Sequence, residues 1–153
     1  MSPMSILVLL LEIFGIENYN HAHYLGRDLQ QAEERTGFWE EIDSSIAASE
    51  YEQLNKEVYS VRLRLTNLRR VTDFQEQFGQ FLHSSINVLD RLRAEHGMSP
   101  VPKWRRTNIV QDLEYQMTTC RRLQDELEIM QERVQIQVDV VGAVTNYEYT
   151  RHC

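Results

Sequence analysis

Residues 51–95 read YEQLNKEVYSVRLRLTNLRRVTDFQEQFGQFLHSSINVLDRLRAE, and this stretch decides the fold. The apolar residues of its first half recur at alternating steps of three and four, and they are Tyr51, Leu54, Val58, Val61, Leu65 and Leu68. This spacing places them on one side of an α-helix and is typical of the heptad seam of a coiled coil. We therefore predict one long helix over about 49–95, with its seam covered by another helix.

The second half of this stretch is spaced differently. Its apolar residues after Leu68 are Val71, Phe74, Phe78, Leu82 and Ile86. The first two follow at successive steps of three, and the others follow at steps of four. Because two successive steps of three move a heptad seam around the helix, we predict a bend or a change of partner near Arg70.

A break follows at residues 96–103, which read HGMSPVPK. Gly97 tolerates the left-handed conformation that ends many helices, and Pro100 and Pro102 lack the backbone donor that a helix interior needs. A second apolar stripe follows, with steps of three or four throughout, at Leu113, Met117, Cys120, Leu123, Leu127, Met130, Val134, Val138 and Val141. We predict a helix over about 109–148 that folds back on the helix over 49–95 as a long antiparallel, coiled-coil-like hairpin.

The N-terminal segment contains the strongest apolar run of the chain, ILVLLLEIFGI at residues 6–16. Its helical stripe continues through Tyr19, Ala22, His23, Leu25, Leu29 and Ala32. We predict a buried apolar helix over about 4–35. The alternative is a secretory signal peptide that is removed near His23. However, no Lys or Arg precedes the run, Glu12 interrupts it, and it is shorter than the ~20 residues that span a bilayer.

Together these segments predict an all-α fold, with one helical domain over residues 1–153. The residues that we expect to form the helix-packing site are Leu54, Val58, Val61, Leu65, Leu68, Leu113, Met117, Leu127, Met130, Val134 and Val138.

Charge is unevenly distributed within a net charge of −7. Residues 1–60 carry 11 acidic and 3 basic side chains, residues 61–110 carry 4 and 9, and residues 111–153 carry 8 and 4. A basic middle between acidic ends favours segments that neutralise each other, within one chain or between copies. We expect a homo-oligomer or partner helices, and no nucleic acid, because the protein is acidic and lacks a basic stripe with interleaved aromatic residues.

No catalytic chemistry is indicated. The sequence holds no G-x-S-x-G, H-E-x-x-H, Walker or paired C-x-x-C motif, so we predict no enzyme activity, no catalytic residue and no cofactor. Cys120 lies in an apolar stripe and is predicted to be buried, and a disulfide with Cys153 is not expected.

Metal binding and one aromatic residue leave alternatives open. His21 and His23 point about 200° apart on a helix and cannot share one ion, so we expect a structural pair. The acidic pairs Glu33–Glu34 and Glu40–Glu41 are predicted to be solvated, with weak Mg²⁺ binding at acidic helix surfaces as the alternative. Trp104 is predicted to cover the hairpin core from a loop, or else to anchor a membrane interface or an acidic partner helix.

Two stretches resemble one family. Residues 7–13, LVLLLEI, followed by a polar helix that ends at Thr36 and Gly37, resemble the early helix of the fungal CorA-like magnesium transporter family. Residues 127–141, LEIMQERVQIQVDVV, resemble the stalk helix that leads those proteins into the membrane. Members are homopentameric ion channels, with a cytosolic region joined through this stalk to two membrane spans. The resemblance therefore implies magnesium ion transport at the cytosolic face of a membrane.

The sequence departs from this family at two points. It ends at His152 and Cys153 without a membrane span, and residues 97–99, Gly-Met-Ser, are not the family's Gly-Met-Asn signature. We therefore expect a truncated cytoplasmic region that assembles through helix packing, does not transport alone, and reaches a membrane only through full-length relatives. The alternative is a helical scaffold or adaptor that binds partner helices and has no ion role.

Overall fold

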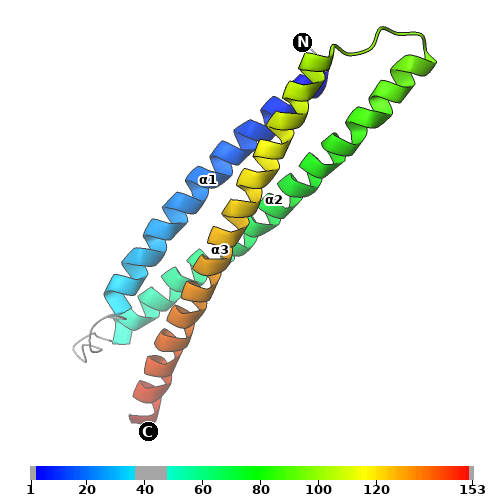
Figure 1. Ribbon diagram of the computed structural model, residues 1–153. Helices are drawn as coiled ribbons and strands as arrows, with labels where there is room; N and C mark the ends of the chain where they lie inside the picture. The colour runs from blue at the N-terminus through cyan, green and yellow to red at the C-terminus, as the bar shows by residue number, and fades with distance from the viewer. Residues whose placement is uncertain (1–2, 37–47, 152–153) are drawn as a thin grey trace. The chain divides into compact units, whose positions relative to one another are not determined.

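The computed structural model describes residues 3–36 and 48–151. Within these ranges the chain forms three α-helices and no strand: α1 (Pro3–Thr36), α2 (Ala48–Glu95) and α3 (Lys103–Arg151) (Figure 1). The all-α prediction is confirmed. Gly37, Glu40, Glu41 and Cys153, which the sequence interpretation used, lie outside the described residues.

The connection between α2 and α3 follows the Gly and Pro signals, with one difference. Gly97 adopts a φ of 64°, and the Met98 amide donates to the Arg93 carbonyl over 2.9 Å, as at a glycine-terminated helix end. However, α3 begins at Lys103 and not near 109. The reason is Pro102, whose carbonyl accepts from the Arg106 amide over 3.1 Å. A proline at a helix entry removes a donor that would have no partner there.

Contacts divide the chain into two units, each built from parts of all three helices. Unit 1 comprises Met1–Tyr19 and Arg70–Gln124, and unit 2 comprises Asn20–Arg69 and Asp125–Cys153. The single helical domain over residues 1–153 stays a prediction.

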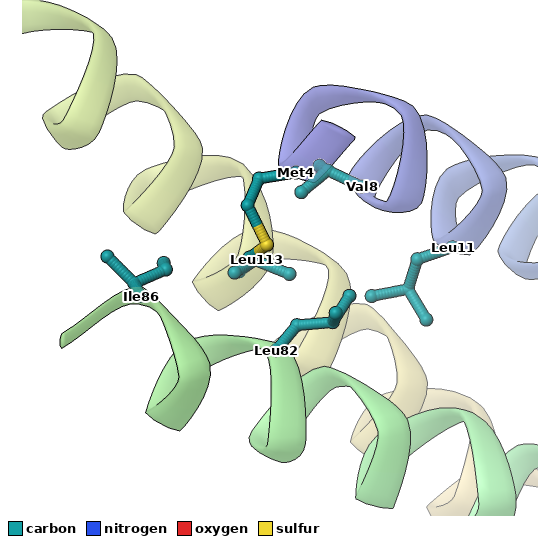
Figure 2. Packing of buried hydrophobic residues seen from close by; sticks show 6 residues of the cluster. All are labelled: Met4, Val8, Leu11, Leu82, Ile86 and Leu113. Atoms are coloured by element: carbon teal, nitrogen blue, oxygen red, sulfur yellow. The ribbon is translucent and has the colours of Figure 1, made fainter. Parts of the chain in front are cut away.

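Unit 1 has an apolar cluster with side chains from each helix. Figure 2 shows these side chains converging on one another, and they are Met4, Val8, Leu11, Leu82, Ile86 and Leu113. Within this unit α2 and α3 are antiparallel, because residues that come later in α3 pair with residues that come earlier in α2. The pairs are Arg106 with Asp90, Arg121 with Glu76, and Gln124 with Asp73.

Unit 2 has a more continuous aliphatic core. Its buried apolar residues include Ala22, Leu25, Leu29 and Ala32 from α1, Leu54, Val58, Val61, Leu65 and Leu68 from α2, and Leu127, Val134 and Val141 from α3. Ion pairs join the helices of this unit at Arg35–Glu57, Arg64–Asp28 and Arg133–Glu33. The Arg64–Asp28 pair joins the basic middle of the sequence to its acidic N-terminal part.

The seam of α2 does not move around the helix near Arg70 as the apolar spacing indicated. The predicted bend or change of partner itself stays a prediction, and the boundary between the two units falls between Arg69 and Arg70. The buried positions of α2 alternate by four and three without interruption, through Leu54, Val58, Val61, Leu65, Leu68, Thr72, Gln75, Gly79, Leu82 and Ile86. Val71 and Phe74 are 47% and 67% exposed. The seam keeps its heptad spacing, but between Leu68 and Leu82 its positions are occupied by polar or small residues. The apolar residues nearest to these positions, Val71 and Phe74, were therefore assigned to the seam by mistake.

The apolar run of α1 is buried on one side only. Met4, Val8 and Leu11 are in the core, and the same heptad spacing continues through Gly15 and Asn18. The other large side chains of the run are exposed, namely Ile6, Leu9, Leu10, Ile13, Phe14 and Ile16. Tyr19 and His23, predicted to continue the stripe, are exposed as well. The prediction of a buried apolar helix therefore holds for Met4, Val8 and Leu11 and is wrong for these exposed side chains.

Candidate functional site: the helix-packing seams

Most of the predicted packing residues lie in unit 2. Eight of the predicted side chains are buried: Leu54, Val58, Val61, Leu65, Leu68, Leu113, Leu127 and Val134. Met117, Met130 and Val138 are half-buried beside the seam. Leu113 and Met117 belong to unit 1, where Leu113 packs with the apolar cluster and Met117 lies against Gly79. The true seam positions next to Met117 and Val138 are Gln116 and Gln137, which are buried.

A layer of buried amides in unit 1 was missed by the sequence interpretation. Asn18 Nδ2 donates to Gln75 Oε1 over 2.8 Å, and Gln75 Nε2 donates to the Leu11 carbonyl over 3.3 Å. Gly15 makes room for this layer, since a Cβ there would lie 3.1 Å from Gln75 Nε2 and 3.2 Å from Gln116 Oε1. The heptad spacing of Asn18, Gln75 and Gln116 was the signal that could have revealed it.

Such a layer selects one arrangement of the helices. A buried amide without a partner costs about 1–3 kcal/mol, so a register that separates Asn18 from Gln75 is disfavoured. Polar residues in the seam of a coiled coil specify register and partner in this way. In the described part of the chain, every fully buried side-chain nitrogen or oxygen has a hydrogen-bond partner.

Unit 2 has a second polar cluster. The Thr36 hydroxyl donates to the Glu33 carbonyl over 2.9 Å and lies 2.7 Å from the side-chain amide oxygen of Gln137. The prediction that Glu33 is solvated is wrong, because its side chain is only 8% exposed, whereas Glu34 is exposed as predicted. Arg133 holds the Glu33 carboxylate with two hydrogen bonds, of which the one from Nε measures 2.9 Å. The hydrogen bonds that Arg133 donates to this carboxylate raise the pKa of Arg133. The pair therefore anchors α3 to α1 within unit 2.

Cys120 is a packing residue in the structure. Its side chain is 3% exposed, and Sγ donates to the Thr72 carbonyl over 3.1 Å. Burial, with a smaller contribution from the nearby Glu76 and Asp73 carboxylates, raises the pKa of the thiol to about 11. The thiol is therefore protonated near neutral pH, which makes it a poor nucleophile.

The histidines and Trp104 lie on surfaces. His21 and His23 are exposed on α1, and in residues 3–36 and 48–151 no three His, Cys, Asp or Glu side chains are close enough to hold a metal ion together. Trp104 is in the first turn of α3 and 63% exposed, with the Arg105 guanidinium 5.3 Å from its ring. The prediction that Trp104 covers the core from a loop is wrong.

Unit 1 also presents large apolar side chains to solvent. On α2, Phe74, Phe78 and Phe81 form a phenylalanine ladder, with ring centroids 6.1 Å and 6.4 Å apart and rings nearly parallel. Phe81 is 63% exposed, and Phe74 slightly more. On α1, the exposed apolar stripe comprises Ile6, Leu9, Leu10, Ile13, Phe14 and Ile16. The sequence pattern predicts burial for Phe74 and for the apolar run of α1, and it assigns Phe81 to no helical stripe.

Comparisons of the sequence with protein-family models, curated proteins and solved structures give no match. Along residues 3–36 and 48–151, no helix offers an apolar stretch that could cross a membrane.

Proposed function

We propose that this protein is a helical scaffold that assembles by helix packing, with the phenylalanine ladder of unit 1 as its docking surface for a second copy of the chain. The observation that carries this proposal is the exposure of Phe74 and Phe81 on either side of the half-buried Phe78. A phenylalanine side chain buries roughly 150–250 Å², so each of these two leaves more than about 100 Å² in water. Burial at ~25 cal/mol per Å² stabilises an interface by ~2–3 kcal/mol for each ring.

The charge distribution supports a second copy as the partner. The residues of α2 beside and beyond the ladder include Gln77, Ser84, Ser85 and Val88, none of which is charged. Two copies with a net charge of −7 each repel one another at most orientations, and an uncharged stretch of α2 reduces this repulsion where they meet. A two-fold interface brings the same surface of both copies together, so an apolar, neutral surface complements itself.

The test is the molar mass in solution by light scattering, over a range of protein concentrations. We expect the wild-type protein to form a complex of at least two copies, and the Phe74→Gln/Phe81→Gln variant to dissociate at concentrations at least tenfold higher. Tyr115→Gln is the matched control, since Tyr115 is 67% exposed in unit 1 but belongs to α3 and not to the ladder. A monomeric wild type, or equal dissociation of both variants, would contradict the proposal. Circular dichroism verifies that all three proteins retain the same helix content.

The resemblance of residues 127–141 to a stalk helix supports a second candidate, the cytosolic helical region of a CorA-like magnesium ion transporter. In that role Mg²⁺ bound between copies favours assembly. We then expect Mg²⁺ to raise the melting temperature and the molar mass, because an ion at 100 times its Kd stabilises by about 2.7 kcal/mol. Calcium at the same ionic strength is the control. If Mg²⁺ changes neither quantity, the scaffold without an ion role is the remaining candidate.

A further inference from the structure

Unit 1 contains a pocket of about 460 Å³ where the start of α1, the end of α2, the 96–102 connection and the start of α3 meet. Met4 and Ile86 of the apolar cluster are among the residues that line it, and Figure 2 shows both side chains beside Leu113. Leu89 and Met98 line it as well. This volume is within the ~300–1,000 Å³ typical of small-molecule sites. The pocket is therefore large enough for an apolar chain of modest length.

The polar residues of this pocket are Asp90, Arg93, His96 and Arg106. Arg106 donates to the Asp90 carboxylate over 2.7 Å and to the Asn87 side chain over 2.7 Å, so this cation is neutralised. Arg93 donates through Nε and Nη2 to the uncharged Ser99 carbonyl. In the described part of the chain, no carboxylate pairs with Arg93. The pocket thus combines apolar walls with one cation that lacks a counter-ion.

We propose that this pocket binds a free, single-chain amphiphile with an anionic head, such as a medium-chain fatty acid. The chain fills the apolar space against Met4 and Ile86, and the carboxylate pairs with the half-buried Arg93. A guanidinium binds a carboxylate through paired hydrogen bonds, and Arg93 retains N–H groups that Ser99 does not use. The two methionines of the lining, Met4 and Met98, adapt to chains of different shape.

The first experiment is a calorimetric titration of the full chain with decanoate, decanol or decyltrimethylammonium. We expect decanoate to bind one site per chain, decanol to bind about tenfold more weakly, and the cationic probe to bind most weakly. Arg93→Gln is expected to reduce decanoate affinity about tenfold while decanol affinity stays unchanged, since hydrogen bonds to charged groups contribute roughly 1.5–3 kcal/mol. Arg91→Gln is the matched control, because it removes the same charge from the same helix outside the pocket lining.

Several results would overturn this assignment. They are an absence of decanoate binding, equal affinity for decanoate and decanol, and equal effects of the two arginine substitutions. A second variant, Leu89→Trp, narrows the pocket from an exposed wall position and is expected to abolish binding without loss of helix content. If that variant instead lowers the molar mass by light scattering, a side chain of another copy occupies the pocket and the proposal is wrong. Arg93-dependent sedimentation with phosphatidylglycerol vesicles, without decanoate binding, would likewise contradict it in favour of a lipid surface.

Discussion

The two units of this protein are built from the same three helices but are packed by different chemistry. In unit 2 the seam is filled by aliphatic residues such as Leu65 and Leu127, both fully buried. In unit 1 the corresponding positions of α2 include Thr72, Gln75 and Gly79, while Phe74 and Phe81 face solvent. Both units leave large apolar side chains in water, Leu63 and Ile129 of unit 2 among them, but unit 1 adds the stacked rings of the phenylalanine ladder. This difference makes unit 1 the candidate for function.

The largest expected effect is a truncation in the core of unit 2. Leu65→Ala should lower the free energy of unfolding by about 3 kcal/mol, since deletion of a fully buried leucine side chain leaves a cavity among its neighbours. Val71→Ala, at a 47% exposed position in unit 1, should change it by less than about 0.5 kcal/mol. Urea titration followed by circular dichroism measures both. Similar losses for the two variants would contradict the continuous seam and favour a seam that moves around α2 to include Val71.

The ion pairs of unit 2 should contribute differently to the free energy of unfolding, according to how deeply each is buried. Arg133→Met leaves the buried Glu33 carboxylate without its partner and should cost about 2 kcal/mol. Arg64→Met removes an equivalent arginine from Asp28, where both side chains are 42% exposed, and should cost less than about 1 kcal/mol. The same urea titration compares them. If the two substitutions lower the free energy of unfolding equally, the Glu33 carboxylate is not a buried group that depends on Arg133.

Two glycines sharpen the comparison between the units. In unit 1, a Cβ at Gly79 would lie 2.9 Å from Met117 Cγ, so Gly79→Ala should destabilise by about 1 kcal/mol despite the higher helix propensity of alanine. In unit 2, the nearest atom to a Cβ at Gly26 is Met130 Sδ at 3.7 Å, an ordinary contact. Gly26→Ala should therefore stabilise by about 0.5–1 kcal/mol. Thermal melts of both variants check these opposite signs, and a stabilising Gly79→Ala would show that the helices of unit 1 are not in close approach there.

An effect of similar size concerns the dependence of stability on pH through Cys120. Because the folded state raises the pKa of this thiol to about 11, the thiol remains protonated when the same group in the unfolded chain has begun to ionise near pH 9. Its contribution to stability is fully present below about pH 8 and is lost as the pH rises through about 11. Between pH 8 and pH 10 the wild type should lose about 1 kcal/mol more than Cys120→Ala. Parallel losses in both proteins would show that the thiol is not buried.

The helices were predictable from sequence because their signals are local. Heptad spacing from Leu54 to Leu68, Gly97 at a helix end and the prolines of the break depend only on neighbouring residues. The packing of unit 1 was not predictable in the same way. Gln75 is buried because Asn18 lies opposite it, 57 positions earlier in the chain, and hydropathy alone assigns a glutamine to the surface. Phe74 presents the reverse case, since an exposed apolar side chain and a buried one look identical in sequence.

The most direct test of the proposed assembly is disulfide cross-linking at the centre of the phenylalanine ladder. Gln77 is exposed on α2 between Phe74 and Phe78, and Thr118 is an exposed residue on α3. Each would be replaced by cysteine in a chain that also carries Cys120→Ala and Cys153→Ser, and oxidised at low protein concentration. We predict a covalent dimer for Gln77→Cys and none for Thr118→Cys. Equal yields for the two variants, or no dimer from Gln77→Cys, would contradict an interface formed by the ladder.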